Sequence, residues 1–594
     1  MVEKVCSRLM WIALLAVLLL GCTQPAPGIA PALSAPKTPT YTPFQPLQPT
    51  SAGGASETPP GTTQLSATSA PPSPTPAVIP SLSPGQAPAV IPEQTAVLMP
   101  GMAQVWIDLR LPDGLRSALA LPAGYLPAGQ AESADLRLEP GAQAAVSQWV
   151  YALVAPFPTL AQGVSAEELR QAWTTGPLTD GPFAGSPLLV DESTLGMISA
   201  TWGEPAPGAA QVLPSAELLD FAWEQQPAWG IVPFEAVEPR WAVLEVDGQS
   251  PLHKEFDPAS YPLVVPISLA GQASASPADT AWIPASNRDP NRLTVVAMTG
   301  VTALVRATAF TMEQRGVKYP GKDVGEWLRQ ADLTHISNEV PFARNCPFPD
   351  PLQPGMRFCS DARYIGLLEE VGTDIVELTG DHFQDWGEAA MLYTLDLYRE
   401  RGWSYYGGGA DLEEGRRALL IEHNGNRLAF IGCNGKRGGY AQARANHPGA
   451  VPCDYDWMEA EIARLRAEGY LPIATFQHFE YYTFQAQPDQ ERDFRRMAQA
   501  GAVVVSGSQA HQPQALEFSG DALIHYGLGN LFFDQFDVSE ACRQAFIDRH
   551  VFYGGRYLGA ELLPILFVDY ARPRPMDPAE RADLLRKVFK ASGW

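Results

Sequence analysis

The second half of the chain repeats one pattern, in which a short apolar strand is followed directly by a turn with polar side chains. Helical stretches separate these strands, and such alternation predicts an α/β fold. Because the loops at the strand ends of α/β folds converge in one crevice, the polar turns are expected to form a site together. Four of the turns carry the candidate residues: Glu339; Asp381 and His382; His478 and Glu480; and His511.

These residue types favour a metal centre, because carboxylates and imidazoles together suit a divalent metal ion. A bound ion could polarise a phosphoryl or acyl oxygen, or activate a water molecule. The identity of the ion is open, and a polar pocket without a metal is the alternative. The predicted ligands are Glu339, Asp381, His382, His478, Glu480 and His511; the candidate catalytic acids and bases are His382, His478 and His511, and the candidate binding residues are Asn338 and Asn530.

Four segments of the second half, in this order, resemble the poly-γ-glutamate capsule synthesis (CapA) family. They are residues 331–339, 380–387 (GDHFQDWG), 501–511 (GAVVVSGSQAH) and 526–534 (YGLGNLFFD), and the resemblance spans residues 292–536. The family is similar to calcineurin-like metallophosphoesterases. The resemblance therefore implies a layered α/β sandwich with metal ligands on strand-end loops, and a role in the synthesis or export of a poly-γ-glutamate-like capsule.

The chain departs from the family pattern at several expected ligands. Val301 stands where the family has an aspartate after its first strand, and Gln509 replaces the first imidazole of a His-x-His motif. The family's Asn-Asn-His is Gly380-Asp381-His382 here, and its His-Trp-Gly-x-Glu is shortened to His478-Phe479-Glu480. Because two ligands are missing, we expect a single remodelled metal site or none, rather than a dinuclear centre.

Other polar residues have a structural interpretation. Asp385 and Gly387 are expected to cap the helix that begins near Glu388. Asn530 follows a glycine, and satisfying the backbone groups of its turn is an alternative to a binding role. The remaining histidines are expected to be core residues (His335 and His525) or to lack a constellation around them (His253, His423, His447 and His550).

Two functions remain open. In the first, the C-terminal domain is a metal-dependent hydrolase or transferase that acts on an envelope polymer or a phosphoester. In the second, it is a non-catalytic surface protein that binds an anionic or peptide-like polymer or serves as a scaffold. Val301 and Gln509 favour the second function, whereas the retained histidines favour the first. The formal net charge of −24 argues against a nucleic-acid partner.

Residues 96–273 predict a separate α/β domain. Strand-like runs occur near residues 105–109 and 241–246, and a helix is expected to begin after Ser165 as its N-cap. The run ALVAPFPTL at residues 152–160 resembles a type 2 periplasmic binding protein, which implies a cleft for a ligand. A structural module without a ligand is the alternative.

The chain begins with the features of a secretory signal: Lys4, Arg8 and an apolar run over residues 9–20 that is too short to span a membrane comfortably. The ending LLGC resembles the bacterial lipobox, which implies lipidation of Cys22 and anchoring on the outer face of the cell membrane. The predicted organisation is a lipoprotein signal peptide (1–21), a disordered Pro/Ser/Thr-rich linker (22–95), the first α/β domain (96–273), a linker (274–291), a CapA-like domain (292–540) and a C-terminal extension (541–594).

The cysteines fit an oxidising compartment. Cys346 with Cys359, and Cys433 with Cys453, are plausible local disulfides, which leaves Cys542 free. None of these cysteines follows a strand in the polar turns, so a catalytic cysteine is not expected.

Overall fold

The computed structural model describes residues 102–143, 145–176, 178–271, 280–436 and 441–594. The predicted signal peptide, Cys22 and the Pro-rich linker lie outside the described residues. Within the described part of the chain, none of the helices has both the length and the apolar character needed to cross a bilayer.

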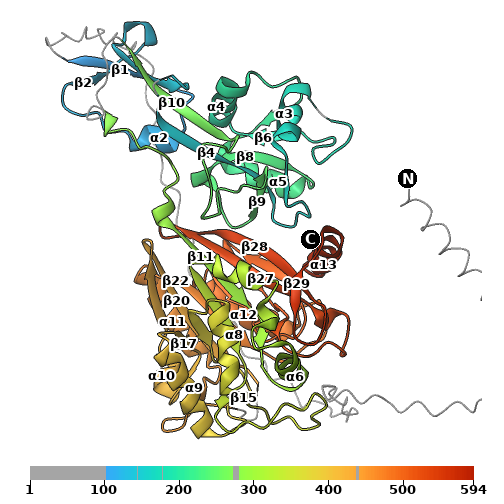
Figure 1. The fold of residues 1–594 in the computed structure, drawn as a ribbon. Helices are drawn as coiled ribbons and strands as arrows, with labels where there is room; N and C mark the ends of the chain where they lie inside the picture. Colours follow the sequence, from blue (N-terminus) through green and yellow to red (C-terminus); the bar gives the residue numbers. More distant parts are fainter. Residues whose placement is uncertain (1–101, 144, 177, 272–279, 437–440) are drawn as a thin grey trace, which may run out of the picture. The chain divides into compact units, whose positions relative to one another are not determined.

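The N-terminal part is a mixed sheet flanked by short helices (Figure 1). Its strand order is β2-β1-β3-β10-β4-β8-β6-β7, and β9 pairs with both β4 and β5. The strands are β1 (Ala103–Ile107), β2 (Tyr125–Pro127), β3 (Leu136–Pro140), β4 (Ala145–Pro156), β5 (Gly163–Val164), β6 (Leu188–Val190), β7 (Ala210–Val212), β8 (Trp229–Pro233), β9 (Trp241–Val246) and β10 (Val264–Gly271); the helices are α2 (Asp113–Ala118), α3 (Ala166–Thr175), α4 (Glu192–Trp202) and α5 (Leu218–Glu224).

The predicted start of helix α3 is confirmed. The Ser165 hydroxyl accepts a hydrogen bond from the Glu168 amide at 3.2 Å, and the Glu168 carboxylate accepts one from the Ser165 amide at 2.8 Å. This reciprocal capping satisfies two amide donors that the first helical turn leaves without partners. The helix then buries Leu169 and Trp173 against the sheet.

The C-terminal part contains two large sheets. The first has the order β17-β16-β13-β11-β27-β28-β29, with β12 pairing with β13 and β26; the second has the order β19-β20-β22-β23-β25-β24. The strands of the first sheet are β11 (Leu293–Thr299), β12 (Val301–Thr302), β13 (Leu333–Asn338), β16 (Ile375–Glu377), β17 (Ser404–Tyr406), β26 (Asn530–Phe532), β27 (Gln544–Tyr553), β28 (Arg556–Phe567) and β29 (Pro573–Pro575). Those of the second are β19 (Leu419–His423), β20 (Asn426–Asn434), β22 (Leu471–Gln477), β23 (Val504–Ser506), β24 (Leu516–Ser519) and β25 (Ala522–His525).

Helices and two short ribbons complete this part. The ribbons pair β14 (Phe342–Ala343) with β15 (Ser360–Asp361), and β18 (Gly408–Gly409) with β21 (Gly449–Ala450). The helices are α6 (Arg306–Arg315), α7 (Gly325–Arg329), α8 (Ile365–Glu370), α9 (Glu388–Glu400), α10 (Leu412–Arg416), α11 (Tyr455–Ala467), α12 (Pro488–Ala500) and α13 (Pro578–Ala591).

The two C-terminal sheets and the helices on their outer faces form four layers, because successive side chains of a strand point to opposite faces of its sheet. Val296 and Met298 on β11 pack with Ile473 on β22, so this core lies between the two sheets. Ala297, on the opposite face of β11, belongs to the core that includes residues of α8 and α9. Ala474 on β22 likewise packs with residues of α11 and α12. This helix–sheet–sheet–helix order confirms the predicted α/β class and the layered sandwich.

Three strands between residues 544 and 575 are part of the first C-terminal sheet. Strand β27 runs antiparallel to β11, with Leu293 opposite Tyr553 and Thr299 opposite Ile547. Strand β28 extends the sheet on the other side of β27. The segment after residue 541, for which the sequence predicted only an extension, therefore supplies central strands.

Both predicted disulfides are present, Cys346–Cys359 and Cys433–Cys453. Among the described cysteines, Cys542 is the free one, and it is buried.

Candidate functional site

The candidate site lies where strands of the two C-terminal sheets end. Glu339 follows β13, and Asp381 and His382 follow β16, the parallel neighbour of β13. Glu480 follows β22, and His511 follows β23, which are parallel neighbours in the second sheet. Because neighbouring parallel strands end at the same edge, each sheet delivers its polar turns to one place.

Two groups of metal-type donors share one residue. Glu339, Asp381 and His382 each offer a ligand atom within 4.8 Å of the others, and so do Glu339, Glu480 and His511. Glu339 is only 2% exposed and belongs to both groups. The structure thus brings together five of the six predicted ligands.

His478, the sixth predicted ligand, is in neither donor group of the described chain. Its Nε2 lies 3.1 Å from Asp493 Oδ2 on helix α12, and its ring packs beside Phe494. The side chain therefore faces the helix layer of the second sheet. Its proximity in sequence to Glu480 does not place it beside the other candidates.

A lysine lies between the two donor groups. The Lys436 ammonium donates to Asp381 Oδ2 at 2.7 Å and also to Glu480 Oε1. Asp381 accepts a further hydrogen bond at Oδ1 from Gln477 Nε2, at 2.6 Å. One residue of each donor group is therefore already bound to an internal cation.

Asp385 orients His382 and does not cap helix α9, which corrects the capping prediction for this residue. Its Oδ2 accepts from His382 Nδ1 at 2.7 Å and from the Phe358 amide at 2.9 Å. The N-cap of α9 is Gly387, which has a φ of 82° and no side chain to offer. With Nδ1 engaged, Nε2 is the nitrogen of His382 that is available for a ligand.

His511 is oriented in the same way by Asn530. The His511 Nδ1 lies 2.9 Å from Asn530 Oδ1, and Asn530 Nδ2 donates back to the His511 carbonyl. The other candidate amide, Asn338, donates to Val340 O at 2.7 Å and to the Tyr398 hydroxyl at 2.9 Å. Asn530 is thus a positioning residue for an imidazole, whereas Asn338 ties strand β13 to helix α9.

Burial and neighbouring charges shift the titration of the shared carboxylate and of His382. Burial raises the pKa of Glu339 to about 7, although His382 and His511 oppose this shift. Burial alone would lower the pKa of His382, but the hydrogen bond to Asp385 and the charges of Asp381 and Glu339 raise it to about 9. His382 is therefore a cation at neutral pH unless a metal ion displaces its proton.

The lysine has the complementary effect on its partners. Burial works against ionisation of Asp381 and Glu480, yet the Lys436 charge holds the pKa of both carboxyl groups below the usual range. The same two carboxylates raise the pKa of Lys436 despite its burial. This trio stays ionised throughout the physiological range.

The two positions that depart from the family pattern are packed as core residues. Val301 is fully buried on β12 among Ala303 and Phe533. Gln509 donates through Nε2 to the Ser337 hydroxyl at 2.7 Å. Gly300, beside Val301, lies so close to the Gly529 carbonyl that a Cβ there would be 1.8 Å from the oxygen.

Several other histidines make definite contacts. His335 bonds the Tyr406 hydroxyl at 2.8 Å and His525 bonds Asp548 at 2.6 Å, both deep in the core as predicted. The prediction that His253, His423, His447 and His550 lack polar neighbours is wrong. His253 Nε2 lies 2.8 Å from Glu561 Oε1, and Nδ1 of the other three lies 3.0 Å from the Thr294 hydroxyl, 2.8 Å from Glu388 Oε1 and 2.9 Å from the Tyr557 hydroxyl, respectively.

Sequence reasoning missed Lys436 and Gln477. Gln477 ends β22, directly before His478, and Lys436 follows the end of β20. The available signal was the turn Asn434-Gly435-Lys436, which is one more polar turn after an apolar strand.

Comparisons with known proteins agree with the resemblance stated above. Residues 295–535 match the family model described as bacterial capsule synthesis protein PGA_cap. The chain is 23% identical over 282 residues to the capsule biosynthesis protein CapA of Bacillus anthracis, a match that covers 46% of this chain and 67% of that protein. It is 23% identical over 289 residues to the PGA biosynthesis protein CapA of Bacillus subtilis (strain 168), covering 48% and 74%.

Solved structures also show similarity to parts of the chain. The 5'-nucleotidase precursor from Thermus thermophilus matches 51% of this chain and 58% of its own, with a TM-score of 0.31 and 12% identity. An ABC-type phosphate transport receptor from Vibrio cholerae matches 30% of this chain and 90% of its own, with a TM-score of 0.23 and 10% identity.

Proposed function

We propose that this chain, whose residues 295–535 match the bacterial capsule synthesis family model, acts in the biosynthesis or export of a capsule or another envelope polymer. We propose further that its C-terminal domain is a hydrolase or transferase assisted by one divalent cation. The observation that carries this is the pair of donor groups that share Glu339. The polymer would be anionic or peptide-like.

The donors present suit a divalent ion. Carboxylate oxygens come from Glu339 and one acidic partner, and an imidazole nitrogen comes from His382 or His511. Each imidazole is held through Nδ1 by an oxygen acceptor, the arrangement that commonly orients a ligating histidine. A bound ion would polarise an acyl or phosphoryl oxygen of the substrate. The remaining imidazole could then hold or deliver a proton at its Nε2.

Charge balance favours one ion over two. Glu339, Asp381 and Glu480 contribute three negative charges when ionised, and Lys436 contributes one positive charge; with both imidazoles neutral, two negative charges remain for the cation to balance. A second divalent ion would leave an uncompensated excess of positive charge in a buried site, which is unfavourable. The buried Val301 and Gln509 offer no replacement carboxylate or imidazole.

A second candidate function, a non-catalytic polymer-binding protein, is supported by the same cations. Lys436 and a protonated His382 balance much of the carboxylate charge without a metal. The domain would then bind the polymer through polar groups alone.

Metal analysis of the purified chain separates the two functions. We expect about one divalent ion per chain, with affinity falling roughly tenfold or more in His511→Ala, because one donor group is then broken. His447→Ala is the matched control, since His447 is 54% exposed and pairs with Glu388 away from the donor groups. A parent chain that takes up no divalent ion and hydrolyses neither a model phosphodiester nor a peptide would leave the binding function.

We also propose that Cys22 carries a lipid that anchors the chain on the outer face of the cell membrane. The support is the LLGC ending of the apolar run, with a Pro-rich segment that would act as a spacer. Cys22→Ser is expected to lose incorporation of a labelled fatty acid and to release the protein from the membrane fraction. Retention of the label in the variant would contradict this.

A further inference from the structure

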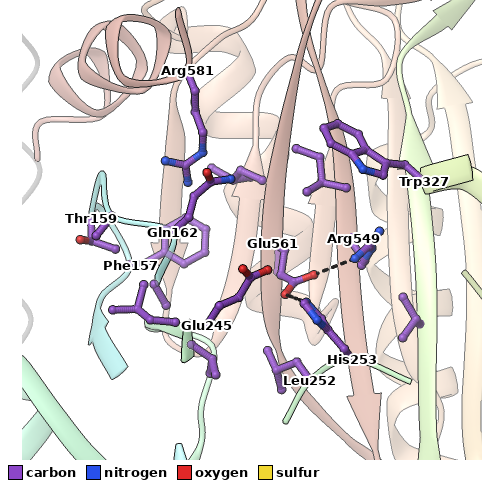
Figure 2. Close-up of a pocket in the computed structure, with 18 of the residues that line it drawn as sticks. Phe157, Thr159, Gln162, Glu245, Leu252, His253, Trp327, Arg549, Glu561 and Arg581 are labelled. Carbon is purple, nitrogen blue, oxygen red and sulfur yellow. Dashed lines mark hydrogen bonds and ion pairs between the residues drawn. The ribbon is translucent and has the colours of Figure 1, made fainter. Parts of the chain in front are cut away.

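A large cavity lies away from the candidate metal site. It has a volume of about 630 Å³ and is lined by β9, the loops at residues 157–162 and 252–255, strand β28 and helix α13 (Figure 2). A volume of this size is ordinary for a small-molecule site. It shares no residue with either donor group.

One wall of the cavity presents a cation without an anionic partner. Arg581, on helix α13, points toward Gln162 in Figure 2 and donates through Nη1 to the Leu160 carbonyl at 2.5 Å. Its Nε is buried without an acceptor, and none of the described carboxylates lies within 4.0 Å of its guanidinium. Burial lowers the pKa of Arg581 to about 10 against the opposing charge of Glu245, so the side chain is still charged at neutral pH. A half-buried guanidinium with free donors is a strong site for a carboxylate, which it can bind through two parallel hydrogen bonds.

The facing side of the cavity presents an anion without a cationic partner. Glu245, on β9, makes no side-chain hydrogen bond or ion pair with the described residues. By contrast, the neighbouring Glu561 is balanced by His253 at 2.8 Å and by Arg549 at 3.3 Å, as the dashed lines in Figure 2 show. The cavity therefore presents the free cation Arg581 and, facing it, the free anion Glu245, which do not pair with each other. The exposed Glu255 is a second carboxylate of the lining that has no hydrogen bond or ion pair among the described residues.

Apolar side chains lie between and around these charges. Phe157, Leu252 and Leu585 line the same space. Two separated opposite charges with an apolar lining match a ligand that carries both charges and an apolar portion. An inorganic phosphate would match Arg581 but would be repelled by Glu245.

We propose that this cavity binds a small zwitterion, an amino acid or a short peptide, with its carboxylate on Arg581 and its ammonium on Glu245. The site joins the N-terminal sheet to the end of the C-terminal domain, so its occupancy stabilises the packing between β9 and α13. This proposal does not depend on a metal or on hydrolase activity.

The test is isothermal titration calorimetry on the chain from residue 22 onward with single amino acids and dipeptides, beginning with L-leucine and leucyl-leucine. We expect binding with a Kd of about 1 mM or lower. Arg581→Gln and Glu245→Gln are each expected to weaken binding by at least about tenfold, because each removes one charged contact. Acetate, butylamine and inorganic phosphate, which carry only one of the two charges, should bind at least about tenfold more weakly.

The matched control is Arg586→Gln, on the exposed face of the same helix, which should leave the affinity unchanged. Circular dichroism shows whether Arg581→Gln still folds, and Glu245→Gln tests the opposite wall independently. The proposal is overturned if no amino acid or dipeptide binds to the folded parent at about 10 mM, ten times the expected Kd. Equal binding of inorganic phosphate, or undiminished binding in both folded variants, would also overturn it.

Discussion

Replacing Glu339 with glutamine is expected to remove divalent-metal binding almost completely, with affinity falling by roughly 100-fold or more. Glu339 is the residue that both donor groups share, so its loss breaks both of them, whereas the loss of His382 or His511 breaks only one. Glutamine keeps the size of the side chain but carries no charge. Titration calorimetry at pH 8, above the pKa of about 7 for Glu339, gives the cleanest comparison.

This variant should remain folded, because the buried carboxyl is already biased toward its neutral form. Glu388→Gln is the matched control, since Glu388 is 55% exposed and contacts His447.

Lys436→Met should have the opposite effect and tighten metal binding by about tenfold or more, because it removes a positive charge from between the two donor groups. An unchanged affinity in Glu339→Gln would exclude this carboxylate as a ligand, and an unchanged affinity in Lys436→Met would remove the charge-balance argument.

The second large effect is expected in acid. Burial lowers the pKa of His335 to about 3 and of His550 to about 4, from a usual value of 6.5. A histidine whose folded pKa is depressed contributes its full stability above pH 6.5 and loses it as the pH falls toward the folded pKa. Between pH 6.5 and pH 5, the two histidines together should lower the free energy of unfolding by about 3 kcal/mol, with roughly half from each.

The raised pKa of Glu339 acts in the opposite direction over this range, so the effect is measured as a difference between proteins. We expect the double variant His335→Gln/His550→Gln to be less stable than the parent at pH 7.5, and this deficit to shrink by about 4 kcal/mol at pH 5. Urea denaturation at both pH values measures it. His447→Gln, which replaces an exposed imidazole, is the matched control. A deficit that stays constant with pH would contradict the argument.

Local signals in the sequence were sufficient for much of the fold. The cap of α3 depends on residues three positions apart, Ser165 and Glu168, and both partners are visible in the sequence. Glu339 and His511 were predicted from their places directly after apolar strands, and the structure places both in the same donor group.

Contacts between residues far apart in the chain explain why the roles of some site residues could not be predicted from the sequence. His478 follows a strand as Glu480 does, but its partner is Asp493 on a helix, and no spacing rule indicates which way the ring turns. Lys436 reaches Asp381 and Glu480 across 55 and 44 positions of the chain, so its role depends on the pairing of both sheets. Asp385 looked like a helix cap from its position, yet His382 and Phe358 compete for its carboxylate.

The antiparallel pairing of β11 with β27 sets the order in which the C-terminal domain can be completed. Leu293 meets Tyr553 across 260 positions, so β11 emerges from the ribosome long before its neighbour exists. Until then β11 has an open edge, which invites pairing with other chains. A chain truncated before β27 would keep this edge open and is therefore expected to be prone to aggregation.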